Sequence, residues 1–464
     1  MIGQRSRQRA AETPFPGLGV RLRQELYFGY QRARGRSLGA VYRRYRREDR
    51  ARTAADGVPD RLRALLRHAR ASVPYYRDHL EGMQDAIEED PLAALAQLPL
   101  LTKPLIRQRF GSLQSADILQ RRTRLQTSGG STGEPVRLIQ DADYQDSAVA
   151  VKLLYSTWAG REPGEPAVEI WGSEEEILRG SSSRRARLAS RLTRVRVVNA
   201  FRMSEDSMRS CLADLNRRPP KLIVAYVQSI DDLAAAAERE GIDVVPQRAI
   251  ISTAGVLQPQ MRERIERVFG CRVFDRYGSR EVGDIAGECA HHRGLHVFPW
   301  TCYVEIVGED GSPVGPGESG RLVVTSLSNF AMPLIRYEIG DRASAIPAGQ
   351  PPCPCGRAGE RIARLVGRTV DTFKAPDGSL VNGEYFTHLL YYKDSIRKFQ
   401  VVQESRSRIV YRLVLSAPLP PEEREEVIRG TRAVMGPGCE VEFEFAKEIP
   451  PSPSGKHRYT ISEI

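Results

Sequence analysis

The sequence predicts an α/β protein, with a large N-terminal domain on a parallel sheet and a small C-terminal α+β domain. From about residue 217, the strand-like segments KLIVAY, QRAIISTAG and CRVFDRYGS are separated by two helical stretches, which end at Gly241 and Gly270. Such alternation is typical of parallel α/β sheets. After residue 369, period-two strand patterns flank one helical stretch, PEEREEVIRGTRAVMG. That pattern predicts a small second domain.

Changes in composition along the chain predict the domain boundaries. Residues 1–57 form a basic helical arm, residues 58–368 the large domain and residues 369–464 the small one. Within the large domain, residues 58–110 carry leucines at helical spacing. Residues 287–357 combine Gly/Pro turns with Cys and His, which predicts a β-rich, metal-binding segment.

Positive charge is concentrated at the N-terminus. Residues 1–52 contain fourteen Arg and four acids, so their balance is 14 − 4 = +10, against +11 for the whole chain of 464 residues. We interpret this arm as a solvated helical lead-in that is dispensable for chemistry, although its apolar stems could pack on a domain surface. An acidic partner or anionic surface is the alternative, and nucleic acid is a weaker one.

The distribution of apolar residues and the number of cysteines indicate the cellular compartment of the protein. No run of eighteen apolar residues occurs, so no membrane span is expected. The N-terminus lacks the apolar core of a secretory signal, and seven Cys is an odd number. We therefore expect a cytoplasmic protein with reduced thiols.

The stretch TSGGSTGEP, residues 127–135, has an unusual composition, with seven Gly, Ser or Thr among nine residues. It is either a flexible linker or a loop that binds an anion. Glycines let backbone N–H groups converge on an anion, and hydroxyl groups add donors. The stretch lacks the Gly-Lys-Ser/Thr ending of a Walker loop.

Three further stretches carry candidate ligand contacts. DRYGSREVGD, residues 275–284, follows a predicted strand, where ligands of open α/β sheets bind. Glu281 in it could hold Mg²⁺ beside a phosphate. PLIRYEIGD ends in Asp341, a carboxylate suited to ribose hydroxyls, and PSPSGKHRY contains Lys456 on a Pro/Ser/Gly loop. Each stretch alone is ambiguous: residues 275–284 could be an ordinary turn with a charged rim, and a lysine such as Lys456 could arise by chance.

Taken in order, these stretches closely resemble the adenylate-forming superfamily of acyl- and aryl-CoA ligases. The series also includes GRTVD at residues 367–371. LLRHARASVPYYRDHL, STAGVLQPQMRERIERVFGCRVFDRYGSRE and CPCGR resemble its phenylacetate–CoA ligase branch and the variant associated with capsular polysaccharide. The resemblance runs from about residue 58 to the C-terminus and implies a large adenylation domain with a small, mobile lid domain.

The resemblance also implies residue roles. Lys456 would contact the substrate carboxylate and the α-phosphate, Glu281 would hold Mg²⁺, and Asp371 would be the hinge of the lid. Two departures, Gly129 and Glu134, alter the phosphate loop, and Glu134 removes a positive charge common there. The implied nucleotide contacts are Ser128, Gly130, Ser131, Thr132, Gly133, Ala254, Gly255, Tyr277, Gly278, Asp341 and Arg368.

Cys and His residues predict a metal site. Cys289, Cys353 and Cys355 offer three thiolates, and His296 or His292 could be the fourth ligand, a set that suits Zn²⁺. Cys-x-Cys is tighter than the usual zinc spacing, so free buried thiols are the alternative. Similar enzymes carry a structural zinc in such segments, and there the matching histidine is His296.

The implied function is ATP-dependent activation of an aryl or other small carboxylic acid, followed by transfer to a thiol, for which coenzyme A is expected. Alternatives are another acceptor (an amine, a carrier-protein thiol or an inorganic nucleophile) and a non-catalytic assembly protein on the same fold. The sequence leaves the acid and the oligomeric state open, a homodimer included. The aromatic residues Tyr155, Trp171 and Tyr226 are either core residues or walls of the acid pocket.

Overall fold

The computed structural model describes residues 17–127, 136–171, 190–199, 205–368, 372–378, 380–382, 386, 389–390, 393, 395–450 and 460–464. The chain divides into two compact units. Within the described ranges, the first comprises residues up to 127, 136–339 and 344–364, and the second comprises residues 340–343 and those from 365 onward. Each unit is described by itself below.

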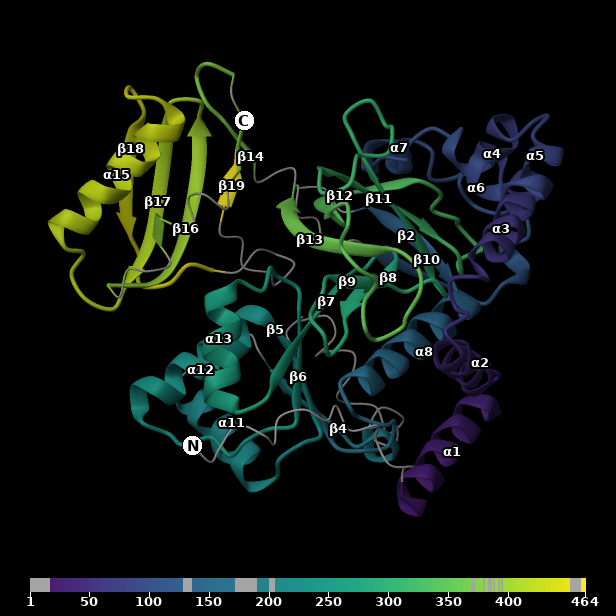
Figure 1. Cartoon of the computed structure of the whole chain (residues 1–464), viewed down its shortest axis with the longest axis horizontal. Coiled ribbons are helices and arrows are strands. Elements are labelled where there is room, and N and C mark those ends of the chain that lie inside the picture. Colours follow the sequence, from purple (N-terminus) through teal and green to yellow (C-terminus); the bar gives the residue numbers. More distant parts are fainter. Residues whose placement is uncertain are drawn as a thin grey trace. The chain divides into compact units, whose positions relative to one another are not determined.

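A large mixed sheet organises the first unit (Figure 1). In the described residues it has eleven strands in the order β10-β11-β12-β13-β9-β8-β7-β6-β5-β3-β4. Strands β4, β3, β5, β6 and β7 are parallel, and β7, β8 and β9 continue the sheet antiparallel. The strand bounds are β3 Ala167–Trp171, β4 Val195–Asn199, β5 Leu222–Tyr226, β6 Ala249–Thr253, β7 Arg272–Ser279, β8 Gly283–Glu288, β9 Leu295–Val297, β10 Cys302–Val307, β11 Ser319–Ser326, β12 Tyr337–Ala345 and β13 Arg361–Arg368.

The parallel strands confirm the fold class predicted from the sequence. Two of the helices between them, α12 (Val227–Glu240) and α13 (Pro259–Phe269), end at Gly241 and Gly270 as predicted. Both glycines have positive φ, 63° and 60°. This left-handed conformation ends a helix at little cost because glycine has no Cβ.

The parallel strands bury a different apolar cluster on each face. On β5, Leu222 and Val224 belong to one cluster, whereas Ile223 and Ala225 belong to the other. This is the period-two alternation of a strand covered on both sides. The first cluster, called the α8 cluster below, includes residues of α8 (Ala142–Trp158). The second, called the α12–α13 cluster, includes residues of α11 (Glu205–Arg217), α12 and α13.

The N-terminal segment is part of the first unit's core. Helices α1 (Leu18–Ala33) and α2 (Leu38–Ala51) contribute the buried side chains of Phe28, Leu38, Tyr42 and Tyr45 to the α8 cluster. The interpretation of residues 18–51 as a solvated lead-in is therefore wrong. Apolar and aromatic residues at helical spacing give these helices a buried face.

Several arginines of the same segment pair with acids elsewhere in the first unit. Arg36 Nε lies 2.7 Å from an Asp146 carboxylate oxygen, and Arg46 forms a two-pronged ion pair with Glu162. Part of the formal charge of the segment is thus neutralised within the fold. Residues 1–16 lie outside the described part of the chain.

Five short helices follow, and two strands flank the Gly/Ser/Thr stretch. The helices are α3 Val58–Ser72, α4 Pro74–His79, α5 Gln84–Glu89, α6 Pro91–Ala96 and α7 Lys103–Gln108. Strand β1 (Thr123–Thr127) pairs antiparallel with β2 (Arg137–Asp141), and Thr127 pairs with Arg137. Residues 128–135, between these two strands, lie outside the described part of the chain.

The second unit carries a four-stranded sheet with the order β18-β17-β16-β19. Helix α15 (Pro421–Met435) contributes Val427 and Met435 to an apolar cluster with residues of β16 and β17. This confirms the predicted small α+β architecture. In the described part of the chain, no helix is both long and apolar enough to cross a membrane. The strand bounds are β14 Thr372–Lys374, β15 Leu380–Asn382, β16 Ile396–Ser405, β17 Arg408–Leu415, β18 Glu440–Phe445 and β19 Thr460–Ser462.

Burial of the N-terminal helices leads to a stability prediction. Leu38 is 2% exposed in the α8 cluster, whereas Leu22 on α1 is 61% exposed. Leu38→Ala should lower the free energy of unfolding by about 2–5 kcal/mol, because it removes buried contacts and leaves a cavity. Leu22→Ala, the matched control, should change it by less than about 0.5 kcal/mol. Denaturant titration of both variants measures the difference, and equal effects would contradict the packing of α2.

Candidate nucleotide site and metal centre

Two predicted nucleotide contacts follow directly after β6. Ala254 has φ of 62°, which is unusual for a residue with a side chain. A Cβ on Gly255 would lie 2.5 Å from Val227 Cγ1, so the loop packs directly on the first turn of α12. The backbone at 254–255 is therefore held in a strained, close-packed conformation. Such strain is typical of functional loops.

The neighbouring strand β7 carries Tyr277 and Gly278 at the same edge of the sheet. Ser252 pairs with Asp275, so Ala254 and Tyr277 each lie two residues beyond a paired position. Ligands of parallel α/β sheets bind outside these carboxyl ends. A Cβ on Gly278 would lie 2.7 Å from the carbonyl oxygen of Gly283 on β8, so the tight β7–β8 hairpin requires glycine here.

Glu281 lies in the turn between β7 and β8 and is buried. The Tyr337 hydroxyl lies 3.5 Å from its Oε1. The Gln140 amide donates to the carbonyl oxygens of Arg280, at 3.0 Å, and Glu281, at 3.4 Å. Contacts from β2 and β12 thus position this carboxylate next to the carboxyl ends of β6 and β7.

The other predicted site residues lie on β12, at the end of β13, or outside the part of the chain that the structure describes. Asp341 is buried on β12 and belongs to the second unit. Arg368 ends β13, and its side chain is not described. The residues outside the described part of the chain are Ser128, Gly130, Ser131, Thr132, Gly133, Asp371 and Lys456.

The three aromatic candidates for the acid pocket divide into two groups. Tyr155 is a core residue, because it is 1% exposed and its hydroxyl donates to the carbonyl oxygen of Asp275 at 2.9 Å. Trp171 and Tyr226 end the neighbouring strands β3 and β5, and their ring centroids are 4.5 Å apart. This pair lies at the carboxyl ends of the parallel strands, where ligands of such sheets bind.

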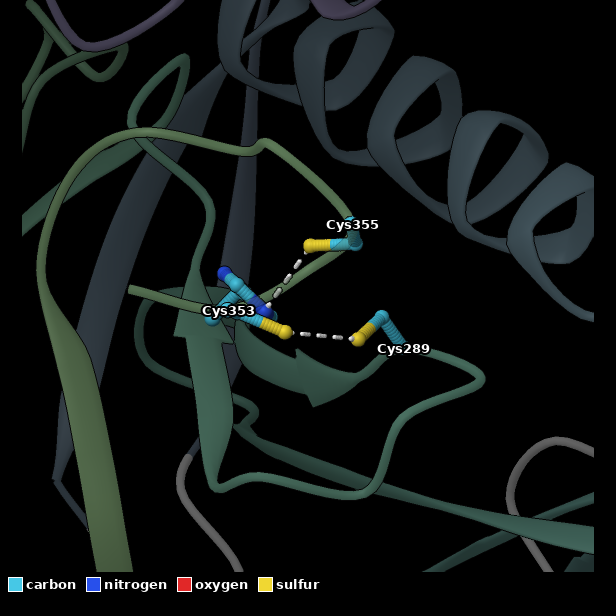
Figure 2. A group of neighbouring side chains, drawn as sticks. Cys289, Cys353 and Cys355 are labelled. Atoms are coloured by element: carbon cyan, nitrogen blue, oxygen red, sulfur yellow. Dashed lines mark hydrogen bonds between the residues drawn. The ribbon is translucent and has the colours of Figure 1, made fainter. Parts of the chain in front are cut away.

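The structure brings together the four predicted metal ligands (Figure 2). Cys289 follows β8, His296 lies on β9, and Cys353 and Cys355 lie between β12 and β13. Their ligand atoms all lie within 4.8 Å of one another. The Sγ atoms of Cys289 and Cys353 are 3.5 Å apart, and Cys355 Sγ lies 3.4 Å from His296 Nε2. The other histidine candidate, His292, instead contacts Glu288 at 3.0 Å.

Burial sets the protonation states of the cluster. Burial lowers the pKa of His296 to about 4, so its ring is neutral at pH 7 and offers a lone pair. Burial also raises the pKa of the Cys289 thiol to about 12, so a cation is needed to hold that thiol as a thiolate at neutral pH. His296 Nδ1 is buried without a hydrogen-bond partner among the described residues, whereas most metal-bound histidines donate from that nitrogen.

Sequence patterns missed the residues that support this cluster. The Arg357 guanidinium stacks 3.9 Å from the centroid of the Trp158 ring on α8, and its Nε lies 2.8 Å from an Asp49 oxygen on α2. These contacts fasten the Cys353–Cys355 loop to two helices. Asp49 and Arg357 are 308 positions apart, so no local pattern connects them.

Asp141 is a second residue that the sequence patterns missed. It ends β2 and caps α8, accepting a hydrogen bond from the Tyr144 backbone N–H at 2.8 Å. Its other oxygen accepts from the backbone N–H groups of Phe330, at 3.0 Å, and Ala331, at 3.1 Å. One buried carboxylate therefore joins the predicted phosphate-loop hairpin, α8 and the segment that leads into β12.

Comparisons with known proteins show what this chain is similar to. Residues 373–463 match a family model described as the CapK C-terminal domain. Protein CapK from Staphylococcus aureus is 22% identical over 412 residues, which cover 87% of this chain and 88% of that protein. Phenylacetate-coenzyme A ligase from Escherichia coli (strain K12) is 26% identical over 321 residues, which cover 67% of this chain and 70% of that enzyme.

A solved structure shares the fold. A 2-hydroxyisobutyryl-CoA ligase in the postadenylation state, in complex with 2-HIB-AMP, matches with a TM-score of 0.67 and 18% identity. The match covers 88% of this chain and 89% of that one. The chain is therefore homologous to CapK and to the phenylacetate–CoA ligases, and it shares the fold of the acyl-CoA ligases.

Proposed function

We propose that this protein activates a small carboxylic acid with ATP as an acyl-adenylate and transfers the acyl group to coenzyme A. The observation that carries the proposal is the arrangement after β6 and β7. There, the strained Ala254–Gly255 loop, Tyr277 and buried Glu281 gather at the ligand-binding edge of the sheet. Homology to phenylacetate–CoA ligases supports the same chemistry.

The first half-reaction joins two anions. A carboxylate oxygen of the acid attacks the α-phosphorus of ATP, the bond to the β-phosphate oxygen breaks, and pyrophosphate leaves. The site must compensate the negative charge that gathers around the α-phosphate. In the proposal, Lys456 supplies one positive charge and Glu281 holds Mg²⁺, which supplies more.

The remaining predicted residues bind the nucleotide. Ser128, Ser131 and Thr132 with the loop glycines surround the β- and γ-phosphates, and Asp341 accepts from the ribose hydroxyls. Ala254, Gly255, Tyr277 and Gly278 flank the adenine, with Arg368 as a further contact. In the second half-reaction, the coenzyme A sulfur attacks the acyl carbonyl carbon and AMP leaves. Rotation at Asp371 exchanges the lid pose between the two steps.

We propose further that the Cys289, His296, Cys353 and Cys355 cluster binds one structural zinc ion. Around a tetrahedral zinc, with bonds of about 2.3 Å to sulfur and about 2.0–2.1 Å to nitrogen, ligand atoms lie roughly 3.5–3.8 Å apart. The observed separations of 3.5 Å and 3.4 Å are close to this. Four protein ligands close the coordination sphere, so zinc would fasten the β8–β9 region to the loop before β13 rather than activate a substrate.

The proposed activity is tested by measuring pyrophosphate release over a library of carboxylic acids, with and without coenzyme A. Lys456→Ala should reduce acyl-adenylate formation by about 10²–10³-fold, because it removes one preorganised charge. It should still consume a synthetic acyl-adenylate with the thiol. Asp371→Pro should do the reverse, since proline fixes φ at the proposed hinge.

The matched control is Lys447→Ala, which removes an exposed lysine from the same unit and should leave both steps unchanged. Wild-type adenylation by Lys456→Ala would refute its assigned role. No pyrophosphate release with any acid would refute the proposed activity itself.

The Ala254–Gly255 loop offers a test of nucleotide binding. Gly255→Ala should weaken ATP binding, because its Cβ would lie 2.5 Å from Val227 Cγ1 and displace the loop. Val227→Ala removes that methyl group, so the double variant should regain much of the affinity. Calorimetric titration of the wild type, both single variants and the double variant gives the coupling between the two changes. Strictly additive effects would contradict the proposed steric link.

Zinc is tested by metal analysis of chelator-washed protein. Wild type should retain about one zinc per chain, and Cys353→Ser should lose it and unfold at lower temperature. Cys211→Ser is the control, because Cys211 is also buried but lies on α11 outside the cluster. Zinc-free wild-type protein, or equal zinc content in both variants, would contradict the proposal.

A further inference from the structure

The first unit contains a cavity of about 140 Å³ beneath α8. Its floor is the α8-facing side of β3 and β5, with Glu169 and Val224 on it, and its walls include Tyr27 of α1 and Ser156 of α8. A cavity of about 150 Å³ is large enough to hold a benzene ring. The space therefore suits a ligand group of about six non-hydrogen atoms.

The charged side chains that line this cavity are mostly basic. They are Arg23, Lys152, Arg161 and Arg276, against the single acid Glu169. Lys152 Nζ pairs with Glu169 at 3.1 Å, and this neighbour lowers the pKa of Glu169, so the two charges offset each other. Buried Arg161 donates to the carbonyl oxygens of Glu165 and Thr193, and the carboxylates of Glu169 and Glu165 act on its charge from nearby.

Arg276 is the residue on which the inference depends. It is 5% exposed, and one of its amino groups lies 3.4 Å from an Asp284 oxygen. Its Nε is buried and has no hydrogen-bond partner among the described residues. A buried donor without a partner costs free energy, and an acceptor placed in the cavity would recover it.

The position of Arg276 relates the cavity to the proposed reaction. Along β7, Val273 belongs to the α12–α13 cluster and Phe274 to the α8 cluster, so Arg276 shares its face with Phe274. The next residue is Tyr277, a proposed nucleotide contact. The cavity and that contact are therefore set by adjacent positions of one strand, which point to opposite faces of the sheet.

We propose that this cavity receives the distal end of the acid substrate, and that Arg276 selects an acid with a second anionic group. This inference rests on the proposed function. The preferred substrate class is a compact dicarboxylic acid, of which one carboxylate is adenylated and the other contacts Arg276. The excess of basic side chains in the lining compensates the buried second carboxylate.

The test compares two pairs of acids in pyrophosphate release. Benzene-1,4-dicarboxylate is paired with 4-methylbenzoate, and hexanedioate with hexanoate, so that each pair exchanges a carboxylate for a methyl group. Wild type should show a kcat/KM at least about tenfold higher for the dicarboxylate of at least one pair. A charge-assisted hydrogen bond contributes enough free energy to account for such a factor. Arg276→Met should lower that ratio by about 10- to 100-fold.

Two further variants separate selectivity from folding. Arg276→Met/Asp284→Asn avoids an unpaired carboxylate and should show the same fall in ratio. Arg321→Met is the matched control. Arg321 on β11 is also ion-paired, at 3.1 Å to Glu338 and, through its Nε, at 3.7 Å to Glu309, and it does not line the cavity. It should leave the ratio unchanged. A wild type that prefers the methyl-ended acid in both pairs, or equal shifts in Arg276→Met and Arg321→Met, would overturn the inference.

Failure of the proposed function has a different signature, because then no acid yields pyrophosphate. In that event, the melting temperature of the protein is measured with each dicarboxylate and its methyl-ended partner. A rise with a dicarboxylate alone, lost in Arg276→Met and kept in Arg321→Met, would support the anion site without the ligase reaction. No selective rise would overturn the site as well.

Discussion

The buried carboxylate of Asp141 is the contact on which the arrangement of the first unit depends. It ends the β1–β2 hairpin, caps α8 and accepts hydrogen bonds from the backbone of Phe330 and Ala331. The hairpin flanks the proposed phosphate loop, α8 covers the cavity, and the segment after Ala331 leads into β12, whose Tyr337 contacts Glu281. Removal of this carboxylate would leave buried backbone donors unsatisfied in parts of the site that are distant in sequence.

The N-terminal helices connect the Cys/His cluster with the cavity. Asp49 of α2 holds Arg357, which stacks on Trp158 of α8 close to Cys355, and Tyr27 of α1 lines the cavity beneath the same helix. A truncation that removes residues 1–52 would delete part of the core, one cavity wall and this support for the metal loop. Loss of activity in such a truncation would report misfolding rather than a role of the basic charge itself.

Local sequence patterns were sufficient where the physical signal is local. Alternating apolar segments predicted the parallel strands, and the glycines at 241 and 270 marked helix ends. The Cys and His spacing indicated the three cysteines of the cluster, and the family resemblance selected His296 over His292. The patterns failed where a residue's role depends on a partner far along the chain. Formal charge does not separate a solvated arginine from Arg46 paired with Glu162, and a strand pattern does not show that Arg276 lines a cavity.

The two faces of β7 explain how acid selection and nucleotide contact could change independently. Residues on one face belong to the α12–α13 cluster and those on the other to the α8 cluster, so Arg276 and Tyr277 point to opposite sides of the sheet. A substitution at 276 alters the charge of the cavity and leaves the ring at 277 on its own face. In the proposed enzyme, one strand therefore fixes the nucleotide contact while a neighbouring position sets the acid that is accepted. This separation lets the fold accommodate different acids through changes on the α8 side alone.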